Sequence, residues 1–168
     1  KQKTAYEIYQ CDWSSDVCSS DLGGLRKDIR SAWSASMSAP EIIAKNPKIR
    51  LKLDRYVFAS AGYALKKYKE KFPFSLLEED TGYEILKYNQ GDFYTEHTDS
   101  FKLSPRAVSC SFALNDNYDG GEWAFFGREK IFKAPKGAAV MFPANFLYPH
   151  EILPVKQGTR YSIITWFN

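Results

Sequence analysis

The chain has 168 residues, of which 44% are hydrophobic and 26% charged, as expected for one globular domain with its own core. The net charge of +3 is too small to indicate a nucleic-acid partner, and no apolar run approaches the roughly 18 residues that a membrane span needs. The three cysteines argue against a disulfide framework and favour a reducing, cytosolic setting.

Residues 1–22 are expected to be a leader that carries no function. The stretch at 11–24, CDWSSDVCSSDLGG, is rich in Ser, Asp and Gly and has no sustained hydrophobic period. Within it, DWSSDVCSSDL resembles a translated sequencing-adapter artefact. The leader is therefore predicted to be non-native or disordered.

Residues 23–80 are predicted to form a helical support region. Residues 25–38 are expected to make a short helix. Residues 48–71 carry apolar side chains at spacings near three and four, with basic residues between them, which predicts a longer helix that ends at Pro73. We expect this helix to pack against a sheet with its basic face in solvent. Its apolar positions are Leu51, Val57, Phe58, Ala61, Leu65 and Tyr68.

Residues 81–168 are predicted to form the core of the same single domain. Short β-prone runs alternate there with turn signals rich in Gly, Pro and Asp. About eight strands at such regular spacing predict a sandwich, a barrel or a jelly roll. The expected strands are 82–88, 93–97, 106–114, 122–126, 129–133, 138–142, 149–153 and 159–167.

The two histidines of the chain and one aspartate form a candidate metal site. His97 and Asp99 are two residues apart, so on a strand both side chains face the same side. His150 follows at the start of another expected strand. Two imidazoles and one carboxylate, with open positions for O2 and a co-substrate, are the arrangement of non-haem Fe(II) oxygenases. The alternative is a pair of histidines that bind no metal.

Arg160 and Ser162 share one face of the last expected strand. A guanidinium binds a carboxylate through two parallel hydrogen bonds, and a hydroxyl can add a third. An arginine buried near the metal would be costly without an anion, which a dicarboxylate such as 2-oxoglutarate supplies. The alternative for Arg160 is an ion pair on the surface.

Three segments carry a resemblance to a known family. The first is Y-x-x-G-x-x-Y-x-x-H-x-D, the second is LNDNYDGGEWAFF from residue 114, and the third runs from residue 135 to 167. Together, residues 82–168 resemble the prolyl 4-hydroxylase-like branch of 2-oxoglutarate/Fe(II) dioxygenases, in particular its small phage and bacterial members. The matching positions are Tyr88, Gly91, Tyr94, His97, Asp99, Leu114, Asn115, Gly120, Gly121, Glu122, His150 and Arg160.

The resemblance implies a mainly β fold with N-terminal helices, built as a double-stranded β-helix (jelly-roll) barrel. It implies that His97, Asp99 and His150 are the iron ligands. Arg160 is then expected to hold the distal carboxylate of 2-oxoglutarate. The co-substrate pocket would include Tyr88 and Ser162, and the substrate pocket Tyr94 and Trp166. The alternative for these aromatic residues is a place in the barrel core.

Two departures from the family pattern qualify these assignments. Some relatives carry a co-substrate-binding tyrosine where this chain has Ala113, beside Phe112, so that contact is expected either to be absent or to be supplied by Tyr88. Animal collagen hydroxylases use a lysine at the position of Arg160, and the peptide-recognition domains of those enzymes are missing here.

The implied function is a dioxygenase that uses Fe(II), 2-oxoglutarate and O2 to hydroxylate a prolyl residue of a peptide or protein, with release of succinate and CO2. Ascorbate is a candidate for keeping the iron ferrous, and a bacterial or phage-infected cytoplasm is the expected location. A nucleobase substrate is disfavoured because no further arginine follows Arg160. The alternatives are a dioxygenase for a nucleobase or small molecule and a non-catalytic metal-binding barrel.

Overall fold

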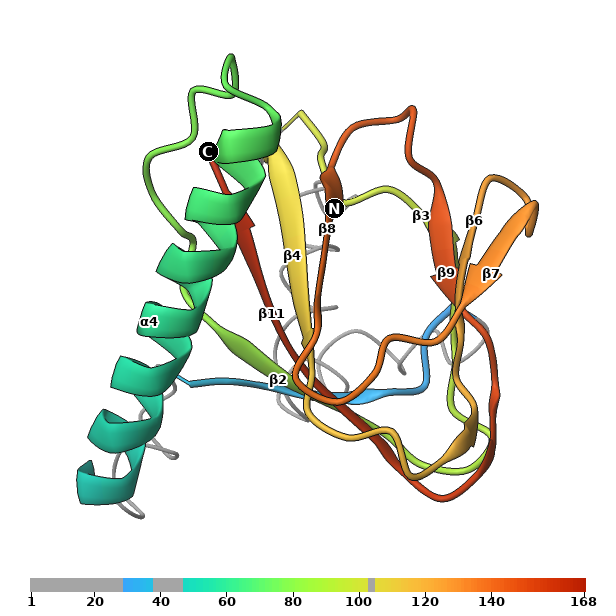
Figure 1. The fold of residues 1–168 in the computed structure, drawn as a ribbon. Helices are drawn as coiled ribbons and strands as arrows, with labels where there is room; N and C mark the ends of the chain where they lie inside the picture. Colours follow the sequence, from blue (N-terminus) through green and yellow to red (C-terminus); the bar gives the residue numbers. More distant parts are fainter. Residues whose placement is uncertain (1–28, 38–46, 103–104) are drawn as a thin grey trace, which may run out of the picture.

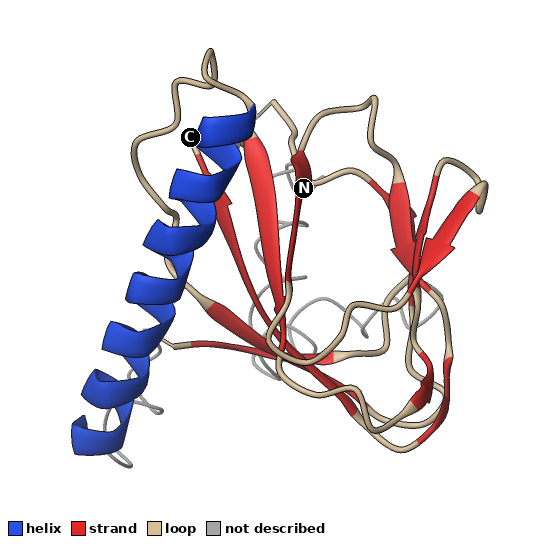
Figure 2. Ribbon diagram, in the orientation of Figure 1, coloured by secondary structure: helices blue, strands red, loops and turns tan. Residues whose placement is uncertain are grey.

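The computed structural model describes residues 29–37, 47–102 and 105–168, as two facing β-sheets with a long helix on the outer side of the larger one (Figure 1 and Figure 2). Within the described residues, no helix has the length and apolar character of a membrane span. The expected leader at 1–22 lies outside the described residues.

The larger sheet has five strands in the order β1-β2-β11-β4-β8, and every neighbouring pair is antiparallel. Its centre is the longest strand, which is also the last in the chain. The bounds are β1 (Trp33–Ser36), β2 (Glu84–Tyr88), β4 (Val108–Ala113), β8 (Ala139–Pro143) and β11 (Arg160–Phe167).

The smaller sheet has four antiparallel strands in the order β3-β9-β6-β7, and a separate two-stranded pair joins β10 to β5. These pairings alternate between segments far apart in the chain, as in a jelly roll. The predicted mainly β, double-stranded β-helix fold is therefore confirmed. The bounds are β3 (Tyr94–His97), β5 (Asp119–Gly120), β6 (Trp123–Phe125), β7 (Lys130–Phe132), β9 (His150–Ile152) and β10 (Val155–Gln157).

Helix α4 (Pro47–Lys71) covers the outer face of the larger sheet. Val57, Ala61 and Ala64 recur every three or four residues and are buried in one cluster with side chains of the larger sheet. The expectation that Leu51 and Phe58 belong to this apolar face is wrong, because they are 53% and 65% exposed. They are seven residues apart, which places both on one side of the helix, away from the buried stripe.

Strand β11 separates the two cores of the molecule. Ile163 and Phe167 point outward into the cluster under the helix. Ile164 packs against the second cluster, which fills the space between the sheets. Because side chains alternate along a strand, Arg160 and Ser162 share the inner face with Ile164. The candidate co-substrate residues are thus directed into the barrel.

The short helix expected at residues 25–38 is wrong where the structure describes it, since Trp33–Ser36 is strand β1. This segment pairs along its whole length with β2 at the edge of the larger sheet. Pairing with an open sheet edge satisfies backbone groups that a short isolated helix would leave exposed. All eight expected strands and the long helix are present, whereas β1, β5 and β10 were not anticipated.

Candidate metal centre

The two histidines meet across a pair of antiparallel strands. His97 ends β3 and His150 begins β9, and the two residues are direct partners in the register of these strands. Their ring centroids lie 4.3 Å apart. Strand pairing therefore brings together two imidazoles that are separated by more than fifty residues of sequence.

Each imidazole is oriented by a backbone carbonyl two residues earlier. His97 Nδ1 lies 2.8 Å from the Thr95 oxygen, and His150 Nδ1 lies 3.0 Å from the Tyr148 oxygen. A carbonyl only accepts hydrogen bonds, so in the neutral rings Nδ1 carries the proton and donates it. The lone pair of each Nε2 is then free for a metal ion, an orientation typical of metal-ligating histidines.

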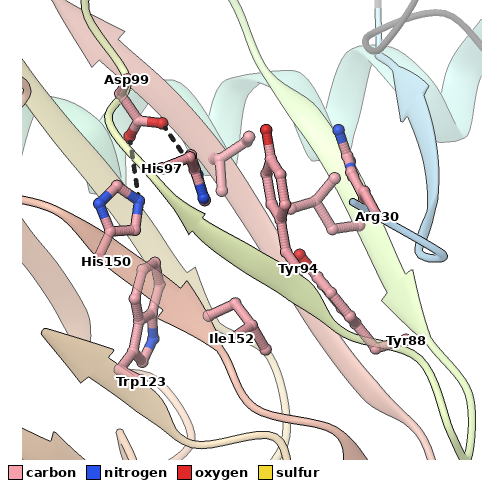
Figure 3. A pocket seen from close by; sticks show the side chains of 10 residues that line it. Arg30, Tyr88, Tyr94, His97, Asp99, Trp123, His150 and Ile152 are labelled. Atoms are coloured by element: carbon pink, nitrogen blue, oxygen red, sulfur yellow. Dashed lines mark ion pairs between the residues drawn. The ribbon is translucent and has the colours of Figure 1, made fainter. Parts of the chain in front are cut away.

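Asp99 supplies the carboxylate opposite both Nε2 atoms. His97 Nε2 lies 3.5 Å from Oδ1, and His150 Nε2 lies 3.7 Å from Oδ2 (Figure 3). The Ser109 hydroxyl donates to Oδ2 at 2.6 Å, and the Arg106 guanidinium donates to the Asp99 backbone oxygen at 3.1 Å. Ser109 therefore holds the carboxylate, and Arg106 holds the backbone of the same residue.

The protonation states of Asp99 and His150 suit a metal ion at neutral pH. Burial acts to raise the pKa of Asp99, but its interactions with His97 and His150 and the Ser109 hydroxyl hold it well below its usual range. Burial lowers the pKa of His150, which is 2% exposed, to about 4. An ionised carboxylate and a neutral imidazole are the forms that bind metals.

The three side chains offer ligand atoms that all lie within 4.8 Å of one another. Two nitrogens and one carboxylate oxygen on one side of a point are the donor set of the 2-His-1-carboxylate centres that hold ferrous iron. The oriented imidazoles and the fixed carboxylate fit such an ion. Among the described residues, no other cluster of at least three such groups was found.

A cavity adjoins the triad and reaches into the barrel interior (Figure 3). Its walls come from both sheets and from the segment before β1. Aromatic and aliphatic side chains predominate, and one arginine lies at the wall. The lining residues are Arg30, Leu86, Tyr88, Tyr94, His97, Asp99, Trp123, His150, Ile152 and Ile164.

Arg160 is 3% exposed and lies against two of the cavity's aromatic walls. Its Cζ atom is 5.0 Å from the Tyr88 ring centroid and 5.5 Å from that of Trp123, and its Nη1 donates to Ser162 Oγ at 3.2 Å. Within the described part of the chain, no carboxylate forms an ion pair with Arg160. A buried guanidinium of this kind favours an anionic ligand.

The expected pocket residues are not all brought to the cavity. Tyr88 lines it and is almost fully buried, and Tyr94 lines it with its ring stacked 3.6 Å from that of His97. Ser162 lies behind the wall as the partner of Arg160. Trp166 is buried but is not among the lining residues, and its ring lies 3.7 Å beneath the Arg106 guanidinium.

Sequence reasoning missed several side chains of the site. Trp123 and Ile152 were seen only as parts of expected strands, although the alternation along β6 and β9 could have placed them inward. Ser109 had no signal of its own, because its contact with Asp99 depends on the pairing of β4 inside the larger sheet. Arg30 was hidden by the mistaken helix at 25–38.

Comparison with known proteins assigns the chain to a family. The family model described as the 2OG-Fe(II) oxygenase superfamily matches residues 83–168, just over half of the chain. This chain belongs to the 2OG-Fe(II) oxygenase superfamily.

Two similar sequences are PKHD-type hydroxylases. A PKHD-type hydroxylase from Synechococcus sp. (strain JA-2-3B'a(2-13)) is 34% identical over 92 residues, which cover 49% of this chain and 40% of the relative. PKHD-type hydroxylase IL0759 from Idiomarina loihiensis is 28% identical over 88 residues, or 39% of its length. The match therefore spans only about two fifths of these curated relatives.

Solved prolyl hydroxylases share the fold. A Pseudomonas putida prolyl-4-hydroxylase superposes with a TM-score of 0.64 at 24% identity, covering 97% of this chain and 80% of that one. A prolyl hydroxylase from Trichoplax adhaerens, solved with a peptide fragment of a hypoxia-inducible factor, gives 0.67 at 18% identity and covers 96% and 73%. The predicted prolyl hydroxylase-like resemblance is confirmed.

Proposed function

We propose that this protein is a 2-oxoglutarate- and Fe(II)-dependent dioxygenase that hydroxylates a prolyl residue of a peptide or protein. The observation that carries the proposal is the triad, in which carbonyl-bound imidazoles turn both Nε2 atoms toward one carboxylate. When bound, ferrous iron with 2-oxoglutarate and O2 supplies the oxidation, so that one oxygen atom enters the substrate C–H bond and the other enters succinate, with loss of CO2.

The chain's own groups have separate tasks in this reaction. His97, Asp99 and His150 hold the iron and leave the opposite positions open. Arg160 binds the distal carboxylate of 2-oxoglutarate, with Ser162 orienting the guanidinium and Tyr88 closing the pocket. The aromatic walls around Trp123 exclude water, so the oxidation is directed to the substrate rather than to solvent.

The substrate pocket is assigned to the side of Tyr94, whose ring covers His97. Its support is the stacking of the two rings and the position of Tyr94 in the cavity wall. Trp166 would support the site from behind, because it packs against Arg106, which donates to the backbone oxygen of Asp99. The prolyl substrate is favoured because the relatives in sequence and fold are hydroxylases, several of them prolyl hydroxylases.

The expected division of the chain is kept as part of the proposal. Residues 81–168 form the catalytic core, and residues 23–80 brace it, with α4 covering one sheet. The functionless leader at 1–22, the cytoplasmic location and the use of ascorbate also remain proposals. Ascorbate would act by restoring ferrous iron, without a protein site of its own.

The test is succinate formation from 2-oxoglutarate by protein reconstituted anaerobically with Fe(II), after O2 is admitted, with and without proline-containing peptides. We expect turnover that the peptides stimulate. Stimulation by single-stranded oligonucleotides or by free small molecules in place of peptides would assign a different substrate. No turnover with iron bound and any of these substrates would leave the non-catalytic barrel as the better description.

A further inference from the structure

Arg160 lies at the first position of β11, where regular pairing with one neighbouring strand has already ended. Strand β11 runs between β2 and β4 in the larger sheet (Figure 1). On the side of β2, Arg160 is still a direct partner of Tyr88. On the side of β4, the last register pair joins Ser162 to Ala113, so regular pairing stops two residues short of Arg160.

The side chain of Asn115 continues the pairing where the backbone of β4 leaves the sheet. One further backbone bond runs from Leu114 N to the Tyr161 oxygen at 3.1 Å. Asn115 Oδ1 then accepts from Tyr161 N at 2.8 Å, and Asn115 Nδ2 donates to the Thr159 oxygen at 2.7 Å. One carboxamide therefore bonds to the residues directly before and after Arg160, as a peptide group of a neighbouring strand would.

The carboxamide of Asn115 suits this pair of bonds. Its oxygen accepts and its nitrogen donates, and both atoms are attached to one carbon, as they are in a peptide group. The second N–H is also used, because Nδ2 donates to Asn117 Oδ1 at 2.9 Å. Three hydrogen bonds thus fix the amide, and two of them fix the backbone on either side of Arg160.

The segment that follows Asn115 returns to the side chain of Arg160. Tyr118 is buried, and a Cβ at Gly121 would lie 3.2 Å from its Cε2 atom and 3.1 Å from Arg160 Cδ, so both side chains lie over the same glycine. Lys133 Nζ donates to the Tyr118 backbone oxygen and lies 4.0 Å from the centroid of its ring. Arg160 is therefore confined near its Cδ atom as well as at its backbone.

A bidentate contact with a carboxylate needs this kind of placement. The guanidinium is a rigid planar fork, and it forms two parallel hydrogen bonds only when its plane meets that of the carboxylate. The ends of strands open more readily than their centres, and Arg160 stands at such an end. Without Asn115, only β2 would hold the backbone there, and the position of the guanidinium would be less defined.

We propose that Asn115 is a positioning residue for Arg160, whose side-chain amide substitutes for a peptide group and holds the start of β11 where the guanidinium meets the distal carboxylate of 2-oxoglutarate. This inference rests on the proposed function, since it assigns a residue to the co-substrate pocket of that reaction. Asn115 acts through Arg160 and does not touch the co-substrate. One of the positions by which the sequence resembles its family thereby receives a task.

The test separates the placement of Arg160 from a general loss of structure. Calorimetry measures the Kd of two ligands for the full chain loaded with Mn(II). One ligand is 2-oxoglutarate, and the other is 2-oxopentanoate, which has the same carbon chain and the same metal-binding end but a methyl group in place of the distal carboxylate. In the wild-type protein we expect 2-oxoglutarate to bind about 30-fold more tightly, as a charged pair of hydrogen bonds allows.

Asn115→Ala should raise the Kd of 2-oxoglutarate about tenfold and leave that of 2-oxopentanoate unchanged, because only the dicarboxylate uses Arg160. Asn115→Gln keeps the carboxamide on a longer side chain and should recover part of the difference. Arg160→Ala should bind both ligands about equally, with or without Asn115→Ala. The matched control is Asn89→Ala, at an exposed position just after β2, which should keep the wild-type preference for 2-oxoglutarate.

An equal rise in both Kd values in Asn115→Ala, or in Asn115→Gln if the alanine variant does not fold, would overturn the inference. A wild-type Kd for 2-oxoglutarate in Asn115→Ala would overturn it as well. Hydrogen exchange gives a second measurement that needs no co-substrate. The Tyr161 amide should exchange about tenfold faster in Asn115→Ala because it loses its acceptor, and an unchanged rate would overturn the inference.

A different outcome would concern the proposed function. Wild-type protein that binds Mn(II) but does not bind 2-oxoglutarate would contradict the proposed reaction, whatever the role of Asn115. The exchange rate of the Tyr161 amide would then still decide whether Asn115 holds the start of β11.

Discussion

At the scale of single residues, the site depends on hydrogen bonds that orient the three side chains of the triad. The carbonyls of Thr95 and Tyr148 hold the two imidazoles, and Ser109 holds Asp99. Each histidine contact reaches back only two residues along the chain, so these ring orientations are largely a local property of the strands. The Ser109 contact is not local, because it requires β4 to lie beside the triad.

Arg160 provides the first prediction. Arg160→Ala should raise KM for 2-oxoglutarate by about 30-fold or more, because a buried carboxylate would lose its charged partner. Steady-state succinate formation at varied 2-oxoglutarate measures this change, with KM for the peptide followed in parallel. The exposed Arg55→Ala on α4 is the control and should leave KM unchanged. An unaltered KM in Arg160→Ala would mean that another residue, such as Arg30, holds the co-substrate.

Glu84 provides a prediction about pH and stability. Its pKa in the folded protein is raised to about 7 from the ordinary 4.5, chiefly by burial. Between these values the folded chain keeps a proton that the unfolded chain releases, so the free energy of unfolding falls as pH rises through this window. Over the whole window the loss is about 3 kcal/mol.

Glu84→Gln is neutral at every pH and should not undergo this loss. Urea unfolding at pH 5 and pH 8 measures the free energy of unfolding of both proteins. From pH 5 to pH 8 this free energy should fall by roughly 2 kcal/mol or more in the wild-type protein relative to the variant. The exposed Glu78→Gln should show no such gain. The same pH dependence of stability in Glu84→Gln and the wild-type protein would contradict the assignment of a buried Glu84 carboxyl group with a raised pKa.

At the scale of elements, the small β5–β10 pair braces Arg160 from behind. Gly120 pairs with Val155, and a side chain at the next residue, Gly121, would approach the Arg160 Cδ atom to 3.1 Å. Gly120 has φ +73°, and a Cβ there would overlap the Pro154 carbonyl oxygen and lie 2.6 Å from the Lys156 nitrogen. Close backbone approach therefore requires glycine at position 120, whereas position 121 is confined by the side chains of Val155, Arg160 and Tyr118.

Gly120→Ala should accordingly lower the free energy of unfolding by about 3 kcal/mol or more, since strained backbone and steric overlap add. Gly137→Ala is the matched control, because Gly137 has φ +84° but open space around its Cα. It should lose only about 1 kcal/mol, the cost of the left-handed conformation. Urea unfolding of both variants makes the comparison, and equal losses would show that the contact with Pro154 has no effect.

At the scale of the whole molecule, the site exists only where the two sheets face each other. The triad belongs to the smaller sheet and its margins, and Arg160 belongs to the larger one. The segment around Arg30 crosses between them. Ligands that contact both sheets bind the folded chain but not the unfolded one, and they must therefore stabilise the folded state.

This arrangement predicts two separable thermal shifts. With Mn(II) as a probe metal and 2-oxoglutarate, each at about 100 times its Kd, each step should add about 2.7 kcal/mol and raise Tm by roughly 5–10 °C. His97→Ala should lose both shifts, because the co-substrate binds through the metal. Arg160→Ala should keep the increase in Tm caused by Mn(II) and lose the increase caused by 2-oxoglutarate. Shifts of wild-type size in His97→Ala would refute the metal assignment.

What could be read from the amino-acid order was mostly local. Short β-prone runs between turn signals identified the eight expected strands. The spacing of His97 and Asp99 placed both on one side of a strand. The same rule put Arg160 and Ser162 together. In each case the residues are close neighbours on one strand, so backbone geometry alone decides that their side chains share a face.

Tertiary structure decided the relations between segments far apart in the chain. The strand at Trp33–Ser36 formed because β2 offered an open edge, an interaction that no local pattern in WSAS encodes. That edge pairing also brought Arg30 into the cavity near Glu84, more than fifty residues later in the chain. Trp166 lies under Arg106 rather than at the cavity wall for the same kind of reason. Such contacts depend on which surfaces bury one another, and burial is a property of the assembled barrel rather than of any one segment.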